Sequence, residues 1–216
     1  MDFAAERGRM VDRLVRGGYI HNPRVREAFL AVPRESFLVP EERAEAYRDT
    51  PLSIGHNQTI SAPSMIAIML EEALLQRGER ILEIGTGSGY HAALLSSLVG
   101  PRNVISIERV EALAERARSN LASVGFGEVT VVVGDGSLGY PDRAPYDCIM
   151  ATAGAPQIPD PWAAQLSSRG RILAPIGPRH GQVLVIATKR ADGGLDAREG
   201  TPCAFVPLVG SQAWPD

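Results

Sequence analysis

The stretch ILEIGTGSGY, residues 81–90, constrains the fold more than any other part of the chain. Apolar residues surround Glu83, glycines follow at alternate positions, and the apolar segment HAALLSSLVG begins directly afterwards. This order indicates a buried strand, a tight turn and a helix. Because glycine has no Cβ, a turn built from Gly85, Gly87 and Gly89 can bend sharply and let a bulky ligand lie against the backbone.

The spacing of these glycines narrows the class of ligand. A dinucleotide fingerprint G-x-G-x-x-G counted from Gly85 would need glycine at position 90, where the chain has Tyr90, so a nicotinamide oxidoreductase is disfavoured. The pattern E-x-G-x-G-x-G is found in methyltransferases that use S-adenosylmethionine, although such a stretch can also be only a tight turn. Glu108 ends the next apolar run, NVISIE, and an acidic residue there can accept hydrogen bonds from both ribose hydroxyls. Glu108 therefore favours the cofactor interpretation.

The chain after residue 80 alternates between strand and helix patterns. We expect strands at 81–85, 103–108, 129–134, 146–152 and 171–177, and helices at 89–99, 110–124 and about 160–167. This order predicts an α/β fold with a Rossmann-like, doubly wound, mainly parallel sheet. Residues 181–190 and the segment ending at 210 are extended runs joined by ADGG, which predicts a C-terminal antiparallel hairpin at the sheet edge.

The N-terminal part has a different character. The spacing of apolar residues in 3–16 predicts a helix. Asn22 is a plausible N-cap for a second helix that starts at Pro23 and stops before Pro33. A polar and then irregular segment leads to Ser61, after which APSMIAIMLEEALLQ is a strong helical pattern. We expect a single domain over 1–216, in which 1–60 form a helical cap and 61–216 the cofactor-binding core.

Composition excludes several classes of protein. The chain has 216 residues, 44% of them apolar, and its net charge of −3 provides no general field that would favour nucleic acid or an anionic membrane. Two widely separated cysteines, Cys148 and Cys203, suit neither a disulfide framework nor a zinc site, so we expect reduced thiols and no metal. The acidic N-terminus lacks the apolar core of a signal peptide, and no apolar run approaches membrane-spanning length, which predicts a cytoplasmic protein.

Three loops should converge on the ligand, because open α/β sheets bind ligands at the carboxyl ends of their strands. These are the glycine turn, Glu108 with Arg109, and residues 134–137. Asp135 is placed to accept a hydrogen bond from an adenine amino group, and Gly136 would permit close approach; alone, Asp135 would more often be a turn residue. The loop after the fourth strand, ATAGAPQIP, lacks the Asn/Asp-Pro-Pro-Tyr type of motif that many base-methylating enzymes carry there, so that activity is disfavoured.

Several stretches together resemble the protein-L-isoaspartate O-methyltransferase family. They are VPRESFLVP, AYRDTPLSIG, QTISAP, ILEIGTGSGY, VVVGDGSLGYPDRAPYDCIMATAGAPQIP, SRGRILAPIG and FVPLVG. The similarity runs from about residue 14 to the C-terminus, and the QTIS and ATAGAP stretches are its most specific parts. The resemblance implies transfer of a methyl group from S-adenosylmethionine to the α-carboxylate of L-isoaspartyl residues in aged proteins. The ester then collapses without enzyme to a succinimide, so the implied role is protein repair.

The resemblance also implies site residues. The proposed active-site serine of the family corresponds to Ser61. Cofactor positions correspond to Gln58, Thr59, Ile60, Glu83, Gly85, Thr86, Gly87, Ser88, Gly89, Glu108, Arg109, Asp135 and Gly136, and substrate positions to Ile60, Ser61, Val209 and Gln212. The implied partners are proteins and peptides that contain isoaspartyl residues, with no nucleic acid or membrane partner.

Chemistry is consistent with this assignment. An α-carboxyl group has a pKa of roughly 3.5, so it is already an anionic nucleophile at neutral pH and needs no general base. Ser61 would orient one carboxylate oxygen through a hydrogen bond. The alternative is that Ser61 only caps the helix beginning near Pro63, or does both.

Four residues depart from the bacterial pattern of the family, namely Asn57, Ala62, Ser64 and His91. Asn57 and Ser64 leave the peptide preference and the loop geometry open, but they do not touch the cofactor residues. Two other functions also stay open. One is methylation of a different acceptor, such as a small carboxylic acid, and the other is non-catalytic binding of S-adenosylmethionine.

Overall fold

A seven-stranded sheet forms the centre of the molecule in the computed structural model, which describes residues 2–215. In sheet order its strands are β5 (Thr130–Val133), β4 (Val104–Glu108), β3 (Ile81–Ile84), β6 (Tyr146–Ala151), β7 (Leu166–Ile176), β8 (Gln182–Lys189) and β9 (Leu195–Cys203). The first five are parallel, whereas β8 runs antiparallel to both of its neighbours. The predicted Rossmann-like sheet with a C-terminal antiparallel hairpin is confirmed. The strand order reverses between β3 and β6, so this edge of the sheet is where a ligand is expected.

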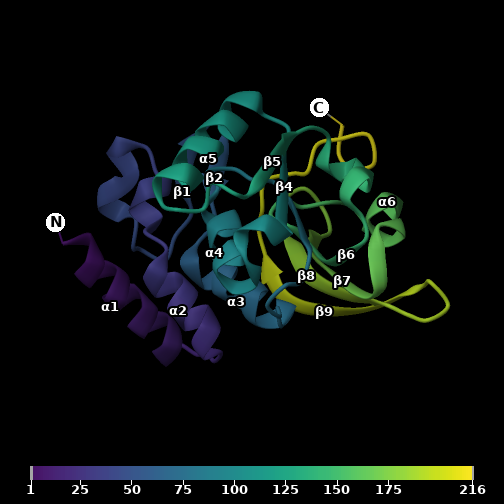
Figure 1. The fold of residues 1–216 in the computed structure, drawn as a ribbon, viewed down its shortest axis with the longest axis horizontal. Coiled ribbons are helices and arrows are strands. Elements are labelled where there is room, and N and C mark those ends of the chain that lie inside the picture. Colours follow the sequence, from purple (N-terminus) through teal and green to yellow (C-terminus); the bar gives the residue numbers. More distant parts are fainter. Residues whose placement is uncertain (1, 216) are drawn as a thin grey trace.

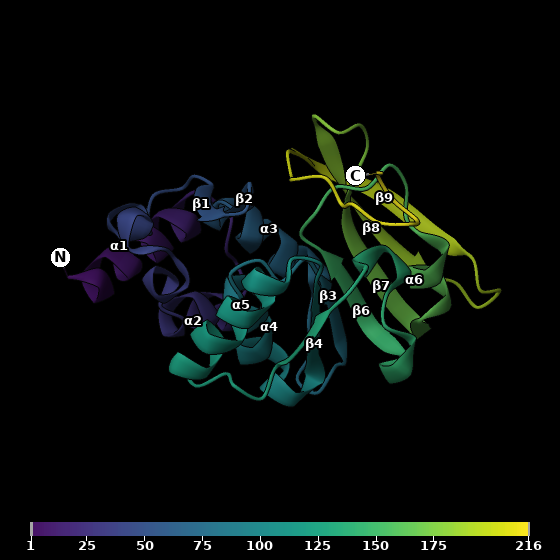
Figure 2. The same ribbon diagram turned by 90° about the horizontal axis from the view of Figure 1, so that it is seen from above.

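Helices cover the two faces of the sheet unequally (Figures 1 and 2). On one face lie α3 (Pro63–Ala73), α4 (Tyr90–Val99) and α5 (Glu111–Ser123), and the helices α1 (Phe3–Arg16) and α2 (Pro23–Ala31) pack outside them. The short α6 (Asp160–Ala164) lies on the opposite face. Side chains along β3 point to alternate faces of the sheet. Ile81 packs in the core on the α4 side and Glu83 contacts α4, whereas Leu82 and Ile84 pack in the second core.

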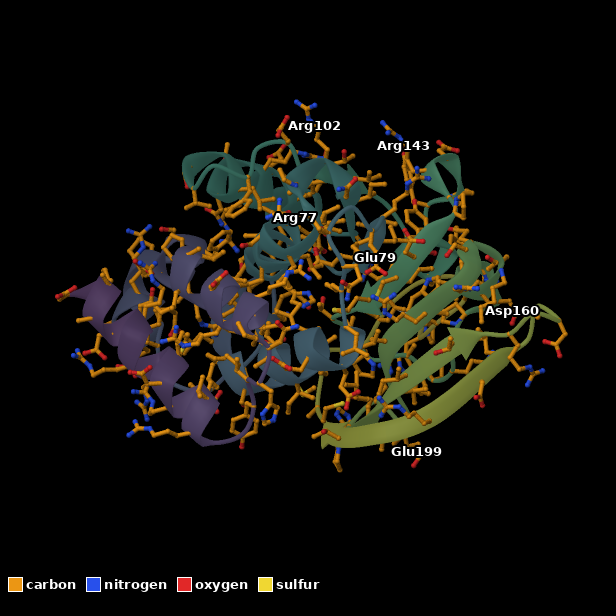
Figure 3. All side chains as sticks on the ribbon, turned by 60° about the horizontal axis from the view of Figure 1, so that its bottom comes forward. Arg77, Glu79, Arg102, Arg143, Asp160 and Glu199 are labelled. Carbon is orange, nitrogen blue, oxygen red and sulfur yellow. The ribbon has the colours of Figure 1, made fainter. Side chains whose placement is uncertain are left out.

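Short 3-10 helices complete the chain. They are η1 (Arg34–Phe37), η2 (Pro40–Glu45), η3 (Pro101–Asn103), η4 (Gly136–Leu138) and η5 (Pro141–Arg143). Charged side chains such as Arg102, Arg143 and Asp160 point outward at the edge of the molecule (Figure 3). Across residues 2–215, every helix is too short or too polar to cross a membrane.

The predicted N-cap of α2 is confirmed, since Asn22 Oδ1 accepts a hydrogen bond from Arg24 N at 2.9 Å. The segment expected to be irregular contains a hairpin instead, formed by β1 (Leu52–Gly55) and β2 (Gln58–Ile60). Its two turn residues, His56 and Asn57, have φ angles of 54° and 56°. A two-residue hairpin of type I′ needs positive φ at both positions, and asparagine tolerates this conformation better than most residues. Asn57 therefore suits the turn.

The end of the sheet also differs from expectation. Helix α6 stops at Ala164, and β7 begins at Leu166 where more helix was expected. The Gln165 side chain explains this early stop, because its amide accepts from Tyr140 N at 2.7 Å and donates to Leu138 O at 2.8 Å. These tertiary bonds fix the chain after little more than one turn. Likewise β9 ends at Cys203, and the tail then turns back across the carboxyl ends of the strands instead of continuing as a strand (Figure 2).

Candidate active site

A pocket of about 740 Å³, including the open space at its mouth, lies at the carboxyl ends of β3 and β4. Its walls come from the β1–β2 hairpin, the glycine turn, the end of β4, the loop after β6 and the tail. The predicted residues that line it are Gln58, Thr59, Gly85, Gly87, Glu108, Arg109, Gly136 and Val209. The loops expected to converge from the first two strands therefore do meet here, together with Gly136 from the third.

A smaller pocket of about 410 Å³ adjoins the first and shares Thr59, Gly85, Gly87 and Thr152 with it. Its other predicted residues are Ile60, Ser61, Thr86 and Ser88, and it also includes Tyr90 and His91. A third hollow of about 590 Å³ continues from Ser61 past Met65 and Phe205. Thr59 and Thr152 line all three cavities, so they stand where these spaces meet.

The glycine turn is shaped by the loop after β6. Gly85 has a φ of +96°, and a Cβ at this position would lie 2.5 Å from Thr152 Oγ1. The Thr152 hydroxyl donates a hydrogen bond to Gly85 O at 2.6 Å. A side chain at position 85 would break this contact, so the close approach requires glycine.

Glu108 is held by the backbone on either side of the pocket. Its Oε2 accepts from Gly87 N at 2.9 Å and its Oε1 from Val110 N at 3.0 Å, and only 7% of the residue is exposed. Each carboxylate oxygen can accept a further hydrogen bond. The carboxylate is thus fixed in place and still able to bind hydroxyl groups of a ligand.

Glu83 lies beneath the turn and lines none of the cavities described here. It is 0% exposed, and its carboxylate accepts hydrogen bonds from His91 Nδ1, 2.9 Å away, and from the Ser106 hydroxyl. The Ser106 hydroxyl lies 2.6 Å from Thr86 Oγ1. The acidic residue of the motif therefore supports the turn from below.

Asp135 and the tail form a separate arrangement. Oδ1 of Asp135 accepts from the backbone N (2.9 Å) and hydroxyl (2.6 Å) of Ser137, and Oδ2 from the backbone N (2.8 Å) and hydroxyl (2.9 Å) of Ser211. Burial raises the pKa of this carboxyl group, but the hydrogen bonds outweigh burial and leave the pKa below its ordinary value. A carboxylate has about four acceptor sites, so these bonds leave none for an adenine amino group in this arrangement. Gln212 is exposed, and its N donates to Ser137 Oγ at 3.0 Å.

The interpretation of Ser61 as a helix cap is wrong. The N-cap of α3 is Ala62, whose side chain makes no capping bond, and the first available donor, Ser64 N, donates to Asp49 Oδ1 at 2.8 Å. Pro63 at the first helical position has no N–H to satisfy. Because Asp49 takes the capping role, the Ser61 hydroxyl has no hydrogen-bond partner among residues 2–215 and lines two of the cavities.

Sequence reasoning missed Thr152, Asp49 and Tyr90. Thr152 could have been found, since it follows the fourth strand at the same sheet edge as the other loops. Asp49 carries no local signal, because its partner lies 15 residues further along the chain. In the sequence Tyr90 shows only that a dinucleotide fingerprint is incomplete; in the structure its ring lies 5.1 Å from the Arg34 guanidinium carbon, and burial raises its pKa to about 12.

Metal and thiol chemistry find no support in the described part of the chain. No group of three or more His, Cys, Asp or Glu side chains within residues 2–215 could hold a metal ion. Both cysteines are free thiols, and burial raises the pKa of Cys148 to about 12, which makes its thiolate inaccessible near neutral pH.

Comparison with known proteins agrees with this geometry. Residues 5–213 match the family model described as protein-L-isoaspartate(D-aspartate) O-methyltransferase. A protein-L-isoaspartate O-methyltransferase from Hyperthermus butylicus is 51% identical, with 98% of this chain and 92% of the relative covered. One from Methanopyrus kandleri is 48% identical, with 98% and 95% covered.

Solved structures give the same result. One protein-L-isoaspartate O-methyltransferase superposes with a TM-score of 0.85 and 32% identity, over 96% of this chain and 67% of the other. A structure from Plasmodium falciparum, described as a protein-L-isoaspartate O-methyltransferase in complex with S-adenosyl-L-homocysteine, superposes with a TM-score of 0.82 and 25% identity. The superposition covers 93% of this chain and 96% of the other. The chain therefore belongs to the protein-L-isoaspartate(D-aspartate) O-methyltransferase family.

Proposed function

We propose that the chain transfers the methyl group of S-adenosylmethionine to the α-carboxylate of L-isoaspartyl residues in proteins and peptides. Membership of the family confirms the predicted enzyme class and cofactor. The observation that carries the proposal is the position of Ser61, whose hydroxyl has no partner among residues 2–215 and faces the cavity beside the glycine turn. A donor is thereby available next to the place where the cofactor is expected.

The residues at the carboxyl edge fit the cofactor. Glu108 would bind the ribose hydroxyls through its remaining acceptor sites, and Arg109 and Gln58 lie in the same pocket. Ile84 lines the pocket, and a Cβ at Gly136 would lie only 2.6 Å from Ile84 Cγ2. The backbone at Gly136 therefore passes close to the pocket wall. Thr59, Ile60, Thr86, Ser88, Gly85 and Gly87 would line the rest of the cofactor, whereas the predicted Gly89 lines neither pocket and faces Leu121. Asp135 would act on this site by holding Gly136 and the tail, and it would contact adenine only after releasing Ser211 or Ser137.

When bound, S-adenosylmethionine supplies a methyl group activated by a positively charged sulfur. The acceptor carboxylate is ionised at neutral pH, so this chain has to orient and desolvate it and needs no base to activate it. Ser61 would donate a hydrogen bond to one carboxylate oxygen and leave the other to attack. The negative carboxylate and the positive sulfur attract each other, and both charges disappear as the methyl group is transferred. A site without water favours both effects, and apolar walls such as Ile60 and Val206 exclude water.

The cavity beyond Ser61 favours a peptide over a small carboxylic acid. It continues past Met65 and Phe205 for about 590 Å³ including its open mouth, which leaves room for residues flanking the isoaspartyl group. Val209 and Gln212 on the tail are further proposed substrate contacts. Val209 lines the main pocket, whereas Gln212 is exposed and could meet only the outer part of a peptide.

We further propose that the chain works as one domain in the cytoplasm on protein substrates, without nucleic acid or membrane partners. The support is a surface of mixed charge and a net charge of −3. Cell fractionation with an antibody against the chain tests this location; recovery in the membrane or nucleoid fraction contradicts it.

Methyl transfer from labelled S-adenosylmethionine to two synthetic peptides tests the proposed function. The peptides differ only in one L-isoaspartyl or normal aspartyl linkage. We expect labelling of the isoaspartyl peptide alone, with the label lost slowly as methanol. A small dicarboxylic acid is the third acceptor. Labelling of that acid alone, or of no acceptor despite cofactor binding, would overturn the isoaspartyl assignment.

A further inference from the structure

His91 completes a hydrogen-bonded chain beneath the glycine turn. It is the second residue of α4, and its Nδ1 lies 2.9 Å from Oε1 of the buried Glu83 on β3. The other oxygen of Glu83 accepts from Ser106, whose hydroxyl in turn contacts Thr86. The Nδ1 side of the imidazole ring is therefore fixed by the Glu83 carboxylate, whose second oxygen is fixed by Ser106.

The opposite side of the ring has no partner. His91 is 6% exposed, and its Nε2 is a buried polar atom without a hydrogen bond. A buried polar group without a partner is destabilising, so an unsatisfied atom of this kind needs an explanation. The same side chain lines the cavity that Ser61 and the glycine turn share. Arg34 also has unpartnered buried nitrogens, but it lines none of the cavities described above.

The position of this cavity indicates which part of the cofactor it receives. Glu108, the proposed ribose acceptor, lines the main pocket, and the cavity of His91 adjoins that pocket at Gly85 and Gly87, which line both. A cofactor whose ribose binds at Glu108 and whose chain crosses the glycine turn places its methionyl end beside His91.

The charge behind the ring selects the group that binds. A carboxylate only accepts hydrogen bonds, so Nδ1 carries a proton; when Nε2 carries none, that atom is an acceptor. The negative charge of Glu83, in surroundings of low dielectric, favours a positively charged donor on the far side of the ring. The methionyl end has one such group, its α-ammonium. We propose that His91 Nε2 accepts a hydrogen bond from the α-ammonium group of the cofactor.

This inference rests on the cofactor site of the proposed function and makes His91 a residue that contacts the cofactor. Binding measurements by calorimetry test it with three ligands. S-adenosylhomocysteine has the complete amino-acid end, decarboxylated S-adenosylmethionine retains the amine but not the carboxylate, and methylthioadenosine lacks both groups.

Two substitutions separate the two nitrogens of the ring. His91→Asn keeps a donor near Nδ1 for Glu83 and removes Nε2, whereas His91→Gln places an amide oxygen near the position of Nε2. For His91→Asn we expect the Kd of both amine-containing ligands to rise about tenfold, with little change for methylthioadenosine. His91→Gln should restore most of the lost affinity.

Three results would overturn the inference. They are unchanged affinity for all ligands, an equal loss that includes methylthioadenosine, and a loss confined to S-adenosylhomocysteine, which would assign the carboxylate instead of the amine. In either of the first two cases, a fall in Tm would show that His91 only supports Glu83. Peptide methylation by the unchanged protein is measured separately, so failure of the isoaspartyl assignment leaves these binding results interpretable.

Discussion

The two sides of the active-site cavities are built differently. On the cofactor side, Glu108 binds the backbone of Gly87 and Val110, and Thr152 binds Gly85, so the polar groups of the turn are satisfied within the protein. On the acceptor side, the Ser61 hydroxyl is unpartnered among residues 2–215, and Thr59 is exposed. The first side is formed before any ligand binds, whereas the second keeps donors available for an acceptor.

The difference also appears along the sequence. On the cofactor side, the glycine turn and Glu108 both lie between β3 and the start of α5, so one strand-turn-helix-strand unit specifies them. The acceptor side combines the β1–β2 hairpin, the start of α3, the loop after β6 and the tail at 204–206. Only the complete fold brings these segments together. Substitutions on the two sides should therefore affect different measurements.

Glu108→Ala should have the largest effect. The substitution removes the carboxylate that binds Gly87 N and Val110 N and that supplies the proposed ribose acceptors, so we expect the Kd for S-adenosylhomocysteine to rise by about 100-fold or more. Calorimetry measures this change. Glu111→Ala, an exposed acid in the first turn of α5, is the matched control and should leave the Kd unchanged. A Kd for Glu108→Ala near that of the unchanged protein would remove Glu108 from the site.

Ser61→Ala should affect turnover and spare cofactor binding. Loss of one hydrogen bond to a charged group predicts a fall in kcat/KM of about 10- to 100-fold, with the Kd for S-adenosylhomocysteine and the Tm nearly unchanged. Steady-state methylation of the isoaspartyl peptide measures this. Ser64→Ala serves as the control, because only the backbone of Ser64 takes part in the helix cap. Equal losses of turnover and cofactor affinity would erase the distinction between the two sides.

Asp49→Ala should destabilise the acceptor side. Removing a helix-capping carboxylate costs about 1 kcal/mol of unfolding free energy, which denaturant unfolding can measure. Asp49→Asn keeps an oxygen acceptor for Ser64 N and should retain most of that stability. If both variants are as stable as the unchanged protein, the cap contributes nothing and the position of Ser61 has another cause.

The smallest expected effect is that of acid on the tail. Because the folded pKa of Asp135 is below its ordinary value of about 3.9, its stabilising contribution is complete above that value and is lost only as the pH falls through the lowered pKa. Carboxyl carbon NMR should show Asp135 ionised throughout pH 7 to 4, and Asp135→Asn identifies the resonance. Titration of Asp135 above pH 4 would show that the bonds to Ser137 and Ser211 do not stabilise its ionised form.

The sequence predicts the site best where the residues that carry the chemistry are close together along the chain. The glycine turn and Glu108 were placed correctly because strand periodicity and the rule for carboxyl ends act over short distances. The β1–β2 hairpin was missed because His56 and Asn57 are an uncommon pair for such a turn. Asp49, Gln165 and Asp135 act through side-chain bonds to distant segments, which neither periodicity nor spacing reveals. The capping interpretation of Ser61 failed for this reason.

The tail that crosses the carboxyl edge has a practical consequence for anyone who handles the protein. Residues 206–209 form one wall of the main pocket, and Ser211 is bound to Asp135, so the last described residues lie beside the binding site. The N-terminal helix lies at the far end of the molecule (Figure 1). An affinity tag, a fluorophore or a surface linker is therefore better attached at the N-terminus, because the last described residues follow the pocket wall by only a few positions.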